Sequence, residues 1–97
     1  MRTIKLMPDY QCFPLWEIYT GKAGHNVDPA DLPISAELCS ELVEWGLKFD
    51  STLNLREPEK SGFADKGFGD DFKKTGFELL NRLKKEIGSE FNVIHHF

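Results

Sequence analysis

Residues 35–53 of the chain are SAELCSELVEWGLKFDSTL, and the spacing of their apolar side chains predicts an amphipathic helix. These side chains recur at steps of three and four, which places them on one helical face. They are Leu38, Leu42, Trp45, Phe49 and Leu53. Ser35 is a suitable N-cap, because its hydroxyl can accept a hydrogen bond from an unpaired amide of the first turn. We therefore expect a helix from about Ala36 to Leu53 that packs onto a sheet.

A second helix is predicted from about Asp70 to Ile87. Its expected inner face consists of Phe72, Gly76, Leu79, Leu80, Leu83 and Ile87. Two acids at residues 70–71 and two lysines at residues 84–85 suit the helix dipole, and Gly88 can end the helix. Gly76 would permit another backbone to approach closely.

Short alternating segments predict strands at Arg2–Met7, Leu15–Tyr19 and Phe91–Phe97. The terminal strand is expected beside the first one. Residues 20–33 and 54–69 are rich in glycine and proline and are expected to be loops. The prediction is a single α+β domain over residues 1–97, with a small two- to three-stranded sheet and two long helices packed against it.

The acidic residues of the chain are unevenly distributed. Its net charge is −4, and residues 26–50 contain six acids against Lys48 alone. The acids are Asp28, Asp31, Glu37, Glu41, Glu44 and Asp50. Because phosphate backbones repel acidic surfaces, direct binding of nucleic acid is disfavoured. A basic protein partner suits this segment better.

The sequence also indicates where the protein acts. No stretch approaches the roughly 18 apolar residues that suggest a membrane-spanning helix. Cys12 and Cys39 occur in a chain with enough apolar residues for a core, which favours reduced thiols over a disulfide. We therefore expect a cytoplasmic protein with no membrane association.

Motifs for catalysis, cofactors and metals are not found in the sequence. Gly62, Gly67 and Gly69 are not followed by the Lys-Ser or Lys-Thr pair of a phosphate-binding loop. His95 and His96 are adjacent on a predicted strand and would point to opposite faces, so they cannot readily hold one metal ion. A pair of His25 with either cysteine lacks a local nucleophile signature. We expect no catalytic residues, no cofactor and no metal site.

The most informative functional feature is an acidic stripe on the first helix. Glu37, Glu41 and Glu44 follow one another at steps of four and three beside the buried face, and Lys48 relieves little of their repulsion. The stripe could be an ordinary solvated surface, or it could attract and dock a cationic protein. Leu47 points away from the core, and it either packs under a loop or belongs to an interface.

The chain resembles small bacterial immunity proteins of polymorphic toxin systems, which include contact-dependent growth inhibition. The resemblance extends over nearly the whole chain. It rests on residues 3–10, Pro14-Leu15-Trp16, Asp28-Pro29, residues 32–35, Trp45, residues 49–54, Pro58, Ser61-Gly62-Phe63 and the last helix. The resemblance implies a cytoplasmic protein that binds one C-terminal toxin domain, commonly a nuclease, and covers its active or substrate-binding surface.

Under this hypothesis an acidic inhibitor imitates the charge of the nucleic acid that the toxin binds. The expected interface residues are Asp28, Asp31, Glu37, Glu41 and Glu44, with Leu47 as an apolar anchor. Asp9 and Tyr10 form a second candidate patch with Trp16, although Trp16 is expected in the core. The expected state is a monomer in a 1:1 complex with a basic toxin domain. The alternative is a housekeeping interaction or adaptor domain that has no toxin partner.

Overall fold

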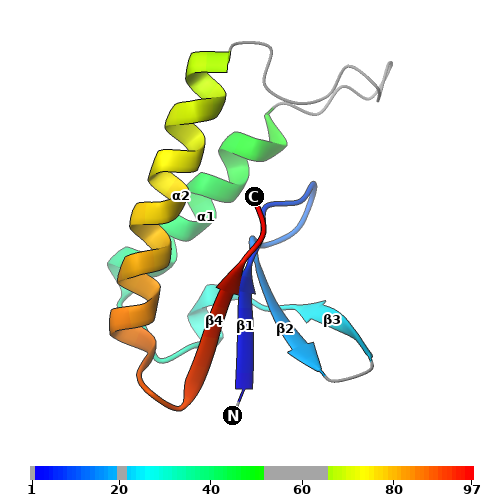
Figure 1. The fold of residues 1–97 in the computed structure, drawn as a ribbon, viewed down its shortest axis with the longest axis vertical. Coiled ribbons are helices and arrows are strands. Elements are labelled where there is room, and N and C mark those ends of the chain that lie inside the picture. The colour runs from blue at the N-terminus through cyan, green and yellow to red at the C-terminus, as the bar shows by residue number, and fades with distance from the viewer. Residues whose placement is uncertain (1, 20–21, 52–65) are drawn as a thin grey trace.

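A computed structural model describes residues 2–19, 22–51 and 66–97. The elements in chain order are β1 (Arg2–Leu6), β2 (Leu15–Tyr19), β3 (Lys22–Asn26), the 3-10 helix η1 (Pro29–Asp31), α1 (Ala36–Asp50), α2 (Lys66–Ile87) and β4 (Phe91–His95). The strands form one sheet in the order β3-β2-β1-β4. β1 is antiparallel to β2 and parallel to β4, and β3 is antiparallel to β2. Figure 1 shows the two helices side by side against the sheet. The α+β class is confirmed.

The core lies between the sheet and the two helices. Ile4, Leu6 and Leu15 are fully buried on the face of β1 and β2 that the helices cover. The helices contribute Leu38, Leu42, Trp45, Phe72, Leu79, Leu80, Leu83 and Ile87. The Trp45 ring stacks on the Phe72 ring at a centroid distance of 4.4 Å, and its Nε1 donates to the Phe72 carbonyl oxygen at 2.9 Å. The predicted apolar faces of both helices therefore form the core.

Gly76 lies where α2 packs closely against neighbouring side chains. A Cβ atom at this position would be 2.6 Å from Cζ2 of Trp45 and 2.9 Å from Cε2 of Phe97. The close approach expected at Gly76 is present, but the neighbours are two aromatic side chains and not another backbone.

The prediction of a loop over residues 20–33 is wrong, because this segment contains β3 and η1. β3 has the sequence KAGHN, which has low strand propensity and no apolar alternation. Its pairing with β2 places Asn26 opposite Trp16 and His25 opposite Glu17. The partner strand therefore provides the order that local sequence does not specify. The sheet has four strands, where two to three were expected.

Four other boundaries differ from the sequence-based expectation, and one of them is the end of β4, which lies at His95 and not at Phe97. α2 begins at Lys66, so the last four residues of the expected loop 54–69 are helical, although this turn contains two glycines. α1 ends at Asp50, and Leu53 lies outside the described residues. β1 ends at Leu6 and not at Met7. The Met7 amide donates to the Pro14 carbonyl oxygen at 2.9 Å, but Pro14 has no amide hydrogen to donate in return.

The sheet face opposite the helices carries Trp16, which is half-buried and not in the core. Trp16 pairs with Lys5 in the β1–β2 register, while the buried Leu6 and Leu15 face the other way. Its Nε1 donates to the Met7 carbonyl oxygen at 3.0 Å. Among the described helices, none combines the length and apolar character needed to cross a membrane.

Candidate functional site

One flank of α1 faces α2 and carries most of the predicted acidic stripe. Arg82 of α2 pairs with Glu41, and its Nη2 lies 3.6 Å from Oε1 of Glu37 and 3.9 Å from Oε2 of Glu86. One guanidinium therefore offsets the charge of carboxylates from both helices. This part of the stripe contributes to helix packing, which the sequence did not indicate.

The same flank holds the start of α1 against the end of α2. Glu86 accepts hydrogen bonds from the Ser35 amide at 2.7 Å and the Ser35 hydroxyl at 3.2 Å. These bonds hold the pKa of the Glu86 carboxyl below its usual range. Ser35 is the predicted N-cap, and its Oγ accepts from the Leu38 amide at 3.1 Å.

The opposite flank of α1 carries a groove. Cys39, Val43 and Leu47 follow one another along it at steps of four, and two hollows of about 330 and 340 Å³ meet at Val43. The first lies between α1 and the loop before β2, where Phe13 and Pro14 line it. The second lies between α1 and η1. We refer to the two adjoining hollows as the α1 groove.

The loop wall of the α1 groove is held by specific hydrogen bonds. Gln11 adopts a φ of 60°, a left-handed conformation that costs energy for a residue with a side chain. Its amide donates to Oδ1 of Asp50 at 2.7 Å. The Asn26 side chain accepts from the Phe13 amide at 2.9 Å and donates to the Phe13 and Leu15 carbonyl oxygens at 2.6 and 3.0 Å. The wall is therefore preorganised.

The α1 groove is acidic. Asp28, Glu44 and Asp50 line it, and no lysine or arginine of the described residues does so. Both cysteines of the chain, Cys12 and Cys39, are free thiols that also line it. Burial raises the pKa of the Cys12 thiol, with further contributions from Asp9 and Asp50. Burial and then Asp28 and Glu86 raise the pKa of the Cys39 thiol.

The structure separates the residues that the sequence assigned to one interface. Asp28 and Leu47 line the α1 groove, and Glu37 and Glu41 lie on the Arg82 flank. Glu44 borders both, because it also lines the hollow between α1 and α2 that contains Glu41 and Arg82. The Asp28 carboxylate also caps η1 by accepting from the Ala30 amide at 2.9 Å. Asp31 is exposed on η1. Leu47 is 59% exposed, so it is not covered by any loop of the described residues.

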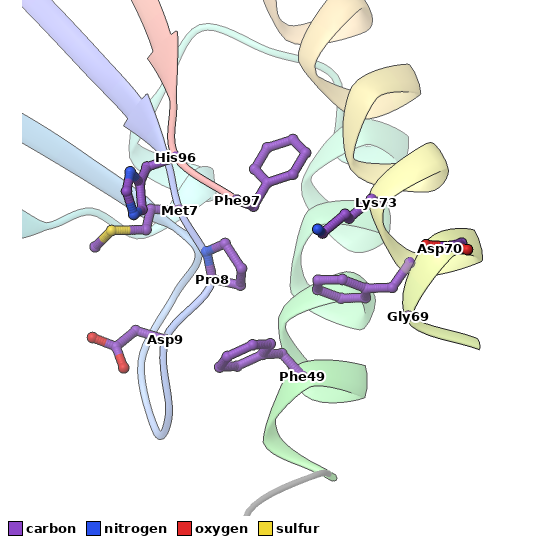
Figure 2. Close-up of a pocket in the computed structure, with 10 residues that line it drawn as sticks. Met7, Pro8, Asp9, Phe49, Gly69, Asp70, Lys73, His96 and Phe97 are labelled. Atoms are coloured by element: carbon purple, nitrogen blue, oxygen red, sulfur yellow. The ribbon is translucent and has the colours of Figure 1, made fainter. Parts of the chain in front are cut away.

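The second candidate patch borders a cavity with a volume of about 780 Å³ (Figure 2). Asp9 lines this cavity, and Figure 2 shows Pro8, Phe49 and Phe97 around it. Tyr10 is half-buried, and its ring stacks on Phe49 at a centroid distance of 4.6 Å. The charged lining includes Asp9 and Asp70 as well as Lys73, so this cavity does not favour a ligand of one charge.

The structure offers no metal centre within residues 2–19, 22–51 and 66–97, where no three His, Cys, Asp or Glu side chains are grouped to hold an ion. His95 packs edge-on against Phe77 at a centroid distance of 5.3 Å, while His96 lines the large cavity.

Most residues that line the α1 groove were not expected from the sequence as site residues. Among them are Cys12, Phe13, Val43 and Asp50. The four-residue spacing of Cys39, Val43 and Leu47 is a local signal of a second apolar line on α1 and could have identified Val43. Phe13 had no such signal, because its position depends on hydrogen bonds to Asn26, which lies 13 residues later.

Comparison with known proteins assigns the family. No curated protein matches the chain. A protein-family model described as Serratia CdiI immunity protein-like matches residues 2–96, which is nearly the whole chain and includes every element of the fold. The chain therefore belongs to the Serratia CdiI immunity protein-like family.

Proposed function

We propose that this protein protects the cell that makes it by binding its cognate toxin in the cytoplasm, as a monomer in a 1:1 complex. Membership of an immunity protein family is the observation that carries the proposal. Family membership also favours a role in which the protein makes and breaks no covalent bonds. Inhibition by contact needs only a rigid surface that fits the toxin.

The toxin domain is proposed to be a basic nuclease. A nuclease binds phosphate through lysine and arginine side chains, so its substrate-binding surface attracts an acidic protein. Six acids lie between residues 26 and 50 of this chain. We propose that this acidic segment covers the surface on which the toxin binds nucleic acid.

The proposed contact residues come mainly from α1 and the elements beside it. They are Asp9, Tyr10, Asp28, Asp31, Glu37, Glu41, Glu44 and Leu47. We expect these residues to contribute unequally to the affinity for the toxin. Glu37 and Glu41 share Arg82, which reduces their attraction for a partner. Glu44 and Leu47 are exposed on α1, and in the described part of the chain Glu44 forms no ion pair with Arg82.

The test is co-expression with the toxin domain encoded by the neighbouring open reading frame. We expect the wild-type protein to restore growth and to co-purify with the toxin as a 1:1 complex, measured by size-exclusion chromatography with light scattering. The combined variant Glu37→Lys, Glu41→Lys and Glu44→Lys is expected to associate more slowly and protect less well, because it reverses three charges.

The outcomes separate the alternatives. A stable complex without protection from growth arrest would favour the adaptor interpretation over the immunity function. Protection against a toxin that acts on something other than nucleic acid would retain the immunity function and refute the nuclease assignment. Unchanged association of the triple variant would remove this acidic face from the interface.

A further inference from the structure

We infer that the α1 groove seats a cationic segment of the toxin that inserts one apolar side chain between Phe13 and Leu47. This inference rests on the proposed function and makes it more specific. It selects the Cys39–Val43–Leu47 flank of α1 as the docking surface over the flank that carries Glu37 and Glu41.

The shape of the groove supports an apolar anchor. The hollow beside Leu47 has a volume of about 330 Å³, at the lower end of the range of roughly 300–1,000 Å³ for ligand clefts. Pro14 and Gly46 lie in direct contact at its wall, since a Cβ atom at Gly46 would be 3.2 Å from Cδ of Pro14. Phe13 and Leu47 are both exposed, at 36% and 59%. An inserted side chain would bury apolar surface on both of them.

The charge of the groove determines the kind of segment that carries this anchor. Asp50 lines the first hollow, and Asp28 and Glu44 line the second. No lysine or arginine of the described residues lines either hollow. A segment with lysine or arginine on both sides of its apolar residue would therefore place opposite charges together, and an acidic segment would be repelled.

The two flanks of α1 differ in how readily they could bind a cationic segment. On the α2 flank, Arg82 already pairs with Glu41 and lies near Glu37, so a toxin cation would have to compete with it. On the groove flank, the hydrogen bonds of Gln11 and Asn26 hold the wall in place before binding. A preformed wall reduces the entropic cost of docking.

The first experiment compares matched substitutions by measuring the Kd for the purified toxin domain. Glu44→Lys and Leu47→Asp are expected to weaken binding at least about tenfold each. Glu90→Lys makes the same charge change at an exposed turn position outside the groove, and Ile94→Asp makes the same apolar-to-acid change on the opposite sheet face. Both controls are expected to bind within about twofold of the wild type. Thermal melting checks that all four variants fold.

The second experiment uses the two native cysteines as probes, because Cys12 lies in one hollow and Cys39 in the other. Alkylation by iodoacetamide at mildly alkaline pH, followed by mass spectrometry, is expected to be slower for both thiols in the wild-type complex than in the free protein. A complex in which both thiols react at the free rate would overturn the inference. So would equal weakening by Glu90→Lys and Glu44→Lys. In both cases the wild-type complex would still support the proposed function, whereas no complex at all would refute that function.

Discussion

At the scale of single residues, the most unusual side chain is an acid within the sheet. Glu17 is only 6% exposed and lies on the helix-facing side of β2, where Ile4 is its β1 neighbour. Arg2 binds it through two hydrogen bonds, Nε to Oε2 at 2.7 Å and Nη2 to Oε1 at 2.8 Å. Arg2 also lies over the Phe91 ring, 5.0 Å from its centroid. A buried carboxylate is tolerated here because it has a bidentate partner.

We expect Glu17→Gln to lower the free energy of unfolding by about 1 kcal/mol at neutral pH, because the amide cannot accept both hydrogen bonds and has no charge. Hydrogen bonding to Arg2 lowers the pKa of Glu17 in the folded state. The stabilising contribution is therefore complete above the unfolded pKa of about 4.3 and is lost as the pH falls through the folded pKa.

Urea unfolding at neutral pH and at about pH 3 would measure this difference. The difference in unfolding free energy between wild type and variant should become smaller in acid. Glu90→Gln, at an exposed turn position, is the matched control and should change stability little. An unfolding free-energy difference that is as large in acid as at neutral pH would contradict a stabilising role of the Glu17 charge.

At the scale of elements, Arg82 links the two helices. It pairs with Glu41 of α1 and lies near Glu37 and Glu86. Removing this cation would leave three carboxylates close together without a base between them. The acids on this flank therefore contribute to the pairing of α1 with α2, and their effect on stability depends on one arginine.

We expect Arg82→Met to lower the free energy of unfolding by up to about 1 kcal/mol at low salt. The loss should shrink in about 1 M NaCl, because the Debye length falls to roughly 3 Å and the repulsion between the carboxylates is screened. Denaturant unfolding at the two salt concentrations is the measurement. Lys74→Met, at an exposed position of α2, serves as the control. A loss independent of salt would indicate a packing effect of the side chain.

At the scale of the whole molecule, negative charge and a groove occur together beside α1. The chain has a net charge of −4, and acids line a groove with a preorganised loop wall. Such an arrangement accelerates the encounter with a basic partner, and this effect weakens as salt increases.

We expect the association rate constant with the toxin domain to fall steeply between about 0.05 and 0.5 M NaCl, while the dissociation rate constant changes less. Stopped-flow fluorescence can follow binding. Glu44→Lys should flatten the salt dependence more than Glu37→Lys does. A rate constant that does not depend on salt would refute electrostatic steering by this protein.

Local sequence was sufficient to predict most of the elements. The period of apolar residues placed Leu38, Leu42 and Trp45 in the core, and the Ser35 cap set the start of α1. The strand Leu15–Tyr19 was predicted with its observed bounds, and the terminal strand lies beside β1 as expected. The helical periodicity, the cap and the strand bounds depend on residues a few positions apart, which leave a pattern in the sequence.

Features that depend on distant residues were not predictable in this way. β3 is ordered by pairing with β2, Arg82 reaches a glutamate 41 positions earlier, and the Gln11 amide finds Asp50 at a separation of 39. The acidic segment was visible in the sequence, but its division between a flank paired with Arg82 and an open groove was not. That division follows from how α2 and the loop before β2 pack on opposite sides of α1, and no local pattern records such packing.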